Sequence, residues 1–448
     1  MAHQIDMTSG SITKKLFSFS LPLIFSSILQ LLFNAADIIV VGRYAGDAAL
    51  SAVGSTSSLI NLLVNLFVGL SVGTTVVCAN YFGAGKKKEV SDTVHTAIIL
   101  SVISGFILTI IGFFGAKEIL RLMQAPEEVL NLATTYLKIY FGGITVTIIY
   151  NFGSALLRAK GDTKRPLYIL FLAGIINVVL NLIFVIVFKI GVAGVATATV
   201  ISQAISAFLI LFCLWKENDE FKFSFSKLKI NGDILRRIIK IGVPAGFQGM
   251  VFSFSNVIIQ SSINSFGVTV IAGNSAASNI EGFIYTSMNG FAQGTLTFVS
   301  QNLGAKKFDR IGKVVFVSLG SVLLVGTALM LIVMITGPKL LGFYTASEDV
   351  ILSGMVRLRM ICIPYVLCGI MDVMANSIRG IGSSLLPMVV TMVGACGIRL
   401  LWLSTIFMIP QFHTYKTILL SYPISWSITF AVLTICFMII FNKKKAKV

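Results

Sequence analysis

The stretch SLPLIFSSILQLLFNAADIIVVGRYAG occupies residues 20–46, and most of it belongs to an apolar run near 15–42 that carries one acidic side chain, Asp37. About 20 apolar residues cross a bilayer as a helix, so this run predicts a transmembrane helix. A carboxylate at bilayer depth costs about 2.5–3.5 kcal/mol on insertion scales unless it pairs, neutralises or faces water. Asp37 is therefore a functional candidate, and it points to a protein that moves something together with a proton or cation.

Further apolar runs extend this pattern over the whole chain. Hydrophobic residues make up 56% of the 448 and charged residues 12%, and the mean hydropathy is +0.91. Twelve runs are long enough to span a bilayer, near 15–42, 50–82, 92–115, 129–152, 165–188, 191–215, 236–265, 277–302, 311–335, 351–376, 386–409 and 414–441. The first is too long for a signal peptide, so we expect it to be retained. The sequence predicts an all-α membrane protein with twelve transmembrane helices.

The net charge of +17 does not indicate nucleic-acid binding. If both termini are cytoplasmic, most of the 35 Lys and Arg residues fall in segments on the inner side. This asymmetry is the positive-inside pattern, which sets the orientation of membrane proteins. We therefore expect a multi-pass protein of the cell membrane with both termini in the cytoplasm.

Residue types that carry enzyme or metal chemistry do not form a recognisable set. The six cysteines all lie in apolar runs without a CxxC motif, and the three histidines are scattered at the ends of runs. These patterns indicate neither a disulfide framework nor a metal site. A Walker motif and a nucleophile–base pair are also absent from the sequence. We expect no enzyme activity and no cofactor beyond a proton or sodium as coupling ion.

An internal duplication appears at one constant offset along the chain, equal to the separation of Arg158 from Arg379, which we call the repeat spacing. The segment RAKGDTKRP at 158–166 matches RGIGSSLLP at 379–387, and Gly69 and Gly73 match Gly290 and Gly294. Each copy holds six spans, so both have the same orientation, as in parallel repeats related by an axis along the membrane normal. The charge-rich segment 216–237 separates them. We expect an N-lobe at 1–215, a cytoplasmic linker at 216–237 and a C-lobe at 238–448.

Together, several segments resemble the multidrug and toxic compound extrusion (MATE) transporters. The resemblance rests on the first span quoted above, GVPAGFQG at 242–249, SQNLGAKK at 300–307, and the LRAKGD and IRGIG turns at 157–162 and 378–382. It implies a V-shaped pseudo-twofold bundle of two six-helix lobes. It also implies antiport by alternating access, in which cationic or amphipathic drugs and toxic compounds leave in exchange for protons or sodium. A monomer in the lipid bilayer is expected.

Candidate ion-coupling residues gather in the N-lobe. Pro22, which can bend a helix, precedes Asp37 by fifteen residues, as the resemblance implies. Asn177 and Asn181 are four apart and share a helix face, and counting back from Lys189 gives Asn181 a depth similar to that of Asp37. Their oxygens could bind a proton or a hard cation such as sodium.

The resemblance adds Thr199 as a hydroxyl ligand in the N-lobe. Some relatives have Asp where this chain has Asn181. A single carboxylate is enough to carry a proton, and one carboxylate with neutral oxygens could still hold sodium. The sequence therefore leaves both a proton and sodium as candidates for the coupling ion.

Polar residues also lie within predicted C-lobe spans. Two positions that are acidic in one branch of the family are Phe252 and Cys368 here. Asp372 lies one turn beyond Cys368, and counting from the helix ends places Arg399 within reach of it, so an intramembrane ion pair is expected. The candidates for a substrate cleft or for intramembrane polar contacts are Glu281, Asp372, Arg399, Gln248, Asn256 and Asn289.

One alternative function is a flippase for a lipid-linked saccharide or another lipid-like substrate, which relatives with a similar fold perform. Those proteins usually have additional spans and a strongly cationic cleft, whereas this chain has twelve predicted spans and few basic residues deep in the membrane apart from Arg399. An embedded enzyme or a channel finds less support, since neither a catalytic set nor a pore-lining pattern is visible. The exporter is the favoured interpretation.

Overall fold

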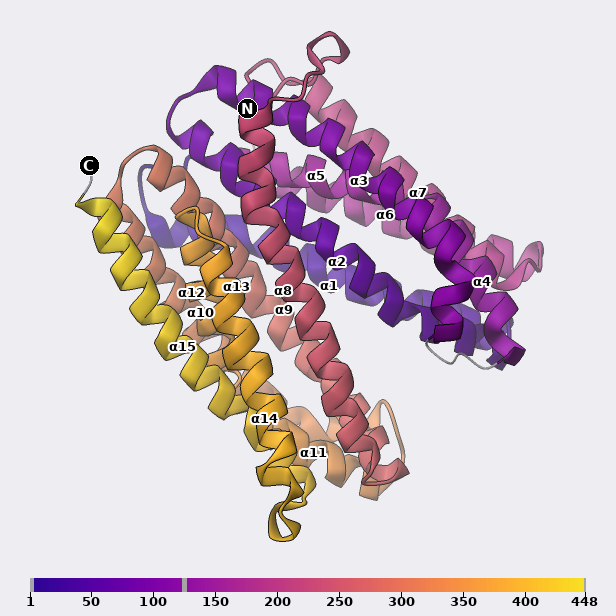
Figure 1. The fold of residues 1–448 in the computed structure, drawn as a ribbon. Helices are drawn as coiled ribbons and strands as arrows, with labels where there is room; N and C mark the ends of the chain where they lie inside the picture. Colours follow the sequence, from indigo (N-terminus) through magenta and orange to yellow (C-terminus); the bar gives the residue numbers. More distant parts are fainter. Residues whose placement is uncertain (1–3, 123–126, 447–448) are drawn as a thin grey trace. The chain divides into compact units, whose positions relative to one another are not determined.

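The computed structural model describes residues 4–122 and 127–446, and over these ranges the chain is helical without any strand (Figure 1). The first half contains α1 (Ile12–Tyr44), α2 (Asp47–Gly83), α3 (Lys87–Leu122), α4 (Glu127–Gly142), α5 (Ile144–Lys160), α6 (Lys164–Leu182) and α7 (Gly191–Trp215). The second contains α8 (Gly232–Asn264), α9 (Val268–Gly304), α10 (Phe308–Gly342), α11 (Glu348–Cys362), α12 (Val366–Gly380), α13 (Leu385–Thr391), α14 (Ile398–Ser404) and α15 (Tyr415–Lys445). Two π-helical segments, Ile183–Val187 and Met392–Gly397, follow α6 and α13.

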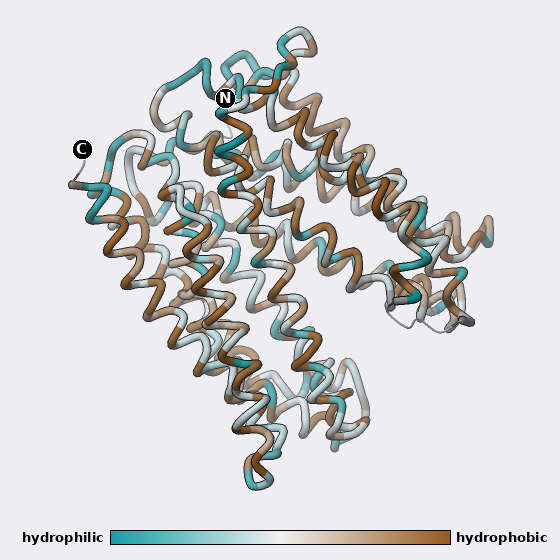
Figure 2. Tube along the Cα trace, viewed as in Figure 1, coloured by the Kyte–Doolittle hydropathy of each residue, from teal (hydrophilic) through white to brown (hydrophobic). Residues whose placement is uncertain are grey.

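Most of these helices have the length and composition of membrane spans. In the described residues 9 helices qualify, or up to 11 if each of two bent pairs counts as one span. The remaining predicted run corresponds to α9, which has 37 residues and is not among the helices that qualify. Hydrophobic residues run along the long helices, and hydrophilic residues gather toward their ends and the loops (Figure 2). The prediction of an all-α membrane protein is confirmed.

Two predicted spans are broken rather than straight. The run at 129–152 is divided into α4 and α5, with a bend of 47° between the two helices. The run at 351–376 is divided into α11 and α12, with a bend of 43°. Gly142 and Gly143 lie at the first break and Pro364 at the second. Glycine favours non-helical conformations and proline removes a helix hydrogen bond, so each break has a local cause.

The helix boundaries recur at the repeat spacing seen in the sequence. Asp47 and Gly83 bound α2, Val268 and Gly304 bound α9 at the same spacing, and both helices have 37 residues. The first residues of α3 and α10 are also separated by the repeat spacing, and the two bends correspond. The two halves of the chain therefore share one helical plan.

The chain forms two compact units. Unit 1 comprises Met1–Asp6 and Phe25–Gly246, and unit 2 comprises Met7–Ile24 and Phe247–Val448. One of the three boundaries between them precedes α1, and the other two fall inside a continuous helix, within α1 and within α8, two residues after Pro22 and Pro244 respectively. Proline weakens helical hydrogen bonding at such points, and the bend at Pro22 stays a prediction. The division into lobes at 216–237 stays a prediction.

Glycines allow α2 and α8 to pack closely within unit 1. A Cβ placed on Gly69 would lie 2.2 Å from the backbone nitrogen of Gly246, and one on Gly73 would lie 2.4 Å from the carbonyl oxygen of Ile238. Gly242, four residues before Gly246, likewise contacts the backbone of α2. Small residues spaced four apart let membrane helices approach to backbone contact. The crossing therefore depends on the absence of side chains at these positions.

The charged segment that follows α7 is bound to unit 1. The Lys160 ammonium donates to a Glu217 oxygen at 2.5 Å and also to Asp219. The Arg165 guanidinium donates to the other Glu217 oxygen at 2.6 Å. Lys160 is 4% exposed, so its charge depends on these two carboxylates. The beginning of the 216–237 segment is therefore an anchored part of unit 1.

We predict that Gly69→Ala destabilises the protein, because its methyl group would overlap the backbone of α8. Overpacking of this kind costs about 1–3 kcal/mol, which a lower melting temperature in detergent would report. Gly54→Ala on the same helix is the matched control, since a Cβ there meets nothing within 4 Å. Equal melting temperatures for the two variants would contradict the close packing of α2 against α8.

Candidate functional site

A polar pocket lies within unit 1, between the second half of α1 and helices α6 and α7. Its volume is about 190 Å³. The lining includes three of the predicted coupling residues, Asp37, Asn177 and Thr199, together with Gln30 and Gln203. Asp37 is half-buried. The pocket is thus both polar and accessible to a small ion.

The four predicted coupling residues form one hydrogen-bonded chain. The amide nitrogen Nδ2 of Asn181 donates to Asp37 Oδ1 at 2.5 Å and to Asn177 Oδ1 at 3.3 Å. Asn177 Nδ2 donates to Thr199 Oγ1 at 3.4 Å, and Thr199 Oγ1 donates to the Val195 carbonyl at 3.0 Å. The structure therefore brings together Asp37 and Asn181, which the sequence placed at a similar depth.

One side-chain oxygen in this cluster, Asn181 Oδ1, lacks a hydrogen-bond partner among the described residues. The Asn181 side chain is 1% exposed, and within the described part of the chain its Oδ1 atom accepts no hydrogen bond. The same holds for Oε1 of Gln203, which lines the pocket. A buried polar atom without a partner costs about 1–3 kcal/mol. A bound cation or a proton donor would relieve this cost.

Gly174 explains how α1 comes close to α6. A Cβ on Gly174 would lie 1.8 Å from the Phe33 ring, so the ring occupies the space that any side chain would fill. Asp37 follows Phe33 by one helical turn, and Asn177 follows Gly174 by three residues. The packing of one aromatic ring on a bare backbone therefore sets the distance between the carboxylate and the asparagines.

An apolar cluster of unit 1 includes residues of α1 that lie close to Asp37 along the helix. Its buried members are Val40, Val41, Ala49, Val53, Tyr136, Val185, Val192, Val195 and Ala196. Val40 and Val41 follow Asp37 by about one turn on α1, and Val195 lies one turn before Thr199 on α7. This cluster lowers the local polarity, which strengthens electrostatic interactions of the carboxylate.

The chemistry available here is the binding of a small cation or a proton. The donor set is one carboxylate, amide oxygens and a hydroxyl, which suits a hard cation. No group of three or more His, Cys, Asp or Glu side chains able to hold a metal ion occurs in the described residues. The roles of Asp37, Asn177, Asn181 and Thr199 in coupling stay predictions.

Asp372 in unit 2 belongs to a different polar group. Its carboxylate interacts with Tyr285 and Asn289 of α9. Asn289 donates weakly to the Tyr285 hydroxyl at 3.5 Å and accepts from Gln293 at 2.7 Å. Asp372 and Asn289, both predicted intramembrane polar residues, are therefore neighbours.

Gln248 and Asn256 lie on the part of α8 that belongs to unit 2. Gln248 accepts a hydrogen bond from the Arg379 guanidinium, which also donates to Asn376 at 3.2 Å. Asn256 is exposed on the same helix. Gln248 therefore serves in part as a partner for a buried arginine, whereas Asn256 is exposed.

The predicted ion pair between Arg399 and Asp372 is wrong. Arg399 Nε donates to Ser425 Oγ at 2.9 Å, and its guanidinium lies over the Tyr422 ring at 4.1 Å and the Trp426 ring at 5.5 Å. The π-helical segment Met392–Gly397 directly precedes Arg399. Such a segment changes the helical repeat, so depth counted with a uniform α-helical rise does not predict the direction of the side chain.

A buried ion pair of unit 2 joins Arg357 and Glu281 instead. Arg357 Nε and Nη2 donate to the two Glu281 oxygens at 2.9 and 2.8 Å. Arg357 Nη1 donates to Asn274 at 2.7 Å, and the Tyr415 hydroxyl donates to the same Asn274 oxygen at 3.0 Å. Both charged side chains are buried, at 7% and 4% exposure. Sequence reasoning missed Arg357, although an arginine within the apolar run 351–376 was a usable signal.

Comparison with known proteins agrees with this architecture. The family model described as MatE matches residues 22–183 and again residues 244–404. Two matches of one model also account for the internal duplication. The chain belongs to the MATE family. It is therefore a membrane transporter, as the resemblance implied.

Curated relatives of this MATE chain include two bacterial proteins described as probable multidrug resistance proteins. YpnP of Bacillus subtilis (strain 168) is 30% identical over 390 residues, covering 87% of each chain. NorM of Thermotoga maritima is 25% identical over 395 residues, covering 87% of this chain and 84% of its own length.

Solved structures show the same fold. An outward-facing multidrug resistance MATE transporter of the MOP superfamily superimposes with a TM-score of 0.92 at 22% identity, over 98% of both chains. A MOP superfamily transporter from Pyrococcus furiosus, described by the reverse polarity of its binding pocket, gives a TM-score of 0.91 at 22% identity and equal coverage. At this identity the likeness establishes the fold alone.

We predict that Glu281→Gln lowers the stability of the MATE chain by about 3–5 kcal/mol, because it leaves the buried Arg357 charge without a carboxylate. The melting temperature in detergent measures the loss. The double variant Glu281→Gln with Arg357→Met removes both charges and should regain most of it. A double variant as unstable as the sum of the single variants would refute the pairing.

Proposed function

We propose that this MATE protein is a secondary antiporter that exports cationic or amphipathic organic compounds in exchange for protons or sodium by alternating access. The observation that supports this most is the contact of Asp37 with Asn181 beside the 190 Å³ pocket of unit 1. A half-buried carboxylate in a membrane helix is stable either when neutralised or when an ion is bound. Loading and release of that ion can therefore bias the protein between conformations.

The names of the relatives support the export of drugs. YpnP and NorM are both described as probable multidrug resistance proteins, and the more distant MepA of Staphylococcus aureus is named a multidrug export protein. We further propose that the protein works as a monomer in the cell membrane with both termini in the cytoplasm. The distribution of Lys and Arg supports this orientation.

Reconstitution into proteoliposomes tests the proposal. Uptake or efflux of a fluorescent organic cation is followed while a proton gradient and a sodium gradient are imposed separately. We expect one of the two gradients to drive transport against the concentration gradient of the dye. Transport that is insensitive to both gradients would overturn the antiport mechanism.

Asp37→Asn should abolish gradient-driven transport, because an amide cannot exchange a proton and loses the charge that binds a cation. The variant keeps the size of the side chain, so it is expected to fold and to reach the membrane. Asp309→Asn is the matched control, since Asp309 is an acid with an 85% exposed side chain. Transport by Asp37→Asn at the wild-type rate would assign coupling to another residue.

Asn181→Asp distinguishes the two coupling ions. A second carboxylate beside Asp37 adds a hard ligand, so sodium should stabilise the variant at lower concentration than it does the wild type. Melting curves over a series of sodium chloride concentrations, with choline chloride at equal ionic strength, measure this shift. An unchanged response to sodium would favour a proton as the coupling ion.

A further inference from the structure

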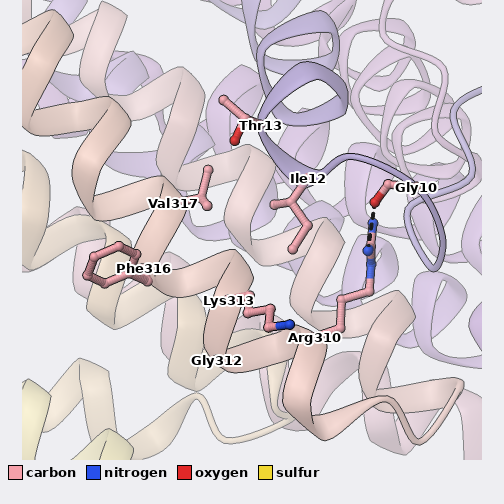
Figure 3. A pocket seen from close by; sticks show the side chains of 8 residues that line it. All are labelled: Gly10, Ile12, Thr13, Arg310, Gly312, Lys313, Phe316 and Val317. Atoms are coloured by element: carbon pink, nitrogen blue, oxygen red, sulfur yellow. Dashed lines mark hydrogen bonds between the residues drawn. The ribbon is translucent and has the colours of Figure 1, made fainter.

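Unit 2 has an open groove between the beginning of α1 and the first turns of α10 (Figure 3). Its volume is about 520 Å³. Ile12 and Thr13 line it from α1, and Lys313, Phe316 and Val317 line it from α10. Lys313 precedes the other two by three and four residues, so these three side chains share one face of α10. The groove thus places an ammonium group one turn above an apolar wall.

The equivalent position in unit 1 is already covered. The first turns of α3 correspond to those of α10, and there the segment between α7 and α8 lies on the helix. The Ser224 amide donates to His95 Nε2 at 3.2 Å, the Asn231 amide to Thr96 Oγ1 at 3.1 Å, and the Asn231 side chain to Asp92 at 3.3 Å. The chain itself therefore occupies this face of α3.

The residues of α10 at the same places differ in chemistry. At the repeat spacing, Lys313 stands where α3 has Asp92, and Phe316 and Val317 stand where it has His95 and Thr96. An acid with two hydrogen-bonding side chains suits a peptide segment. A cation above an aromatic and an aliphatic side chain suits an amphipathic ligand with a negative head.

Two basic residues, Arg310 and Lys313, line the groove, and Lys313 is the one available to bind an anion. Arg310 is engaged by the segment before α1, since it donates to the carbonyls of Met7, Ser9 and Gly10 at 3.0, 2.6 and 2.9 Å. Lys313 is exposed. Within the described ranges its ammonium makes no hydrogen bond or ion pair, and its charge acts only at longer range, on Asp309.

The surroundings of the groove are also strongly cationic. A hollow of about 510 Å³ beside it shares Arg310 and Lys313 and adds Lys306, Lys307 and Lys445. The one acid of that hollow, Asp309, is paired with Lys445 at 2.8 Å. The field over the groove therefore favours an anion.

We propose that this groove binds an anionic phospholipid, with the phosphate at Lys313 and the first part of an acyl chain along Phe316 and Val317. The Phe316 ring is 78% exposed on a membrane helix, so it lies where a lipid tail can reach it. The distance from Lys313 to Phe316 along the helix is about 4.5 Å, similar to the step from headgroup to hydrocarbon. Basic pockets between transmembrane helices bind anionic headgroups in this way.

The purified full-length protein in detergent, titrated with phosphatidylglycerol and followed by native mass spectrometry, tests the proposal. We expect the first phosphatidylglycerol to bind more tightly than phosphatidylcholine. Lys313→Ala should weaken phosphatidylglycerol binding about fivefold, which is the effect of one basic residue near an anionic lipid, and Lys313→Arg should retain it. Lys227→Ala is the matched control, because Lys227 is an exposed lysine of unit 1.

A second variant tests the apolar wall without changing the charge. Gly312 also lines the groove, and a Cβ there meets nothing within 4 Å, so Gly312→Leu should fold and fill the space. We expect it to lose preferential phosphatidylglycerol binding. Gly320→Leu, on the same helix and equally free of contacts, should not.

Three results would overturn the proposal. Equal losses in Lys313→Ala and Lys227→Ala would show binding by general surface charge. Unchanged phosphatidylglycerol affinity in Gly312→Leu would place the lipid elsewhere. Competition by inorganic phosphate at concentrations similar to those of the lipid would show an anion site that does not use the acyl chain. The transport function proposed above does not depend on any of these outcomes.

Discussion

Lipid offers no hydrogen bonds to a polypeptide, and most features of this molecule follow from that constraint. Backbone groups must bond within their own segment, so the described chain is helical and irregular backbone is confined to the connections. Helices in lipid gain little from hydrophobic burial, so α2 and α8 are held by backbone contact at Gly69, Gly73, Gly242 and Gly246. Charged side chains in the spans must likewise find partners, and Arg357 and Glu281 do so in a bidentate pair.

The duplication supplies a common scaffold, but the two copies carry different chemistry. Unit 1 holds an acid that contacts amides, with no basic partner in the described hydrogen-bonding cluster. Unit 2 holds a neutralised ion pair and an arginine on aromatic rings. At the repeat spacing, Trp402 stands where unit 1 has Asn181, and Arg357 where unit 1 has Tyr136. The coupling candidates are therefore confined to one copy.

Under the proposed antiport mechanism, this asymmetry corresponds to different roles for the two units. The Asp37 carboxylate contacts a neutral amide, so binding a proton or a cation there would leave no hydrogen-bonded countercharge unpaired in that cluster. The Arg357–Glu281 pair is costly to separate, because each charge would remain buried without compensation. Unit 1 is therefore suited to ion exchange, whereas the ion pair of unit 2 is suited to holding α9 and α11 together.

The sequence alone determined the features that depend on local geometry. Apolar runs of sufficient length predicted the spans, the repeat spacing predicted the shared helical plan, and the positions of Asn177 and Asn181 one turn apart placed both on one face of α6. The contact with Asp37 agrees with the depth counted back from Lys189, although that count crosses the π-helical segment Ile183–Val187. Only the tertiary structure decided which charges pair across helices. Arg357 selects Glu281, and Arg399 turns to Tyr422 and Ser425, because helix adjacency, a π-helical segment and bends at Gly142, Gly143 and Pro364 determine where a side chain points. These depend on the packing of the whole unit, which spacing along one helix does not contain.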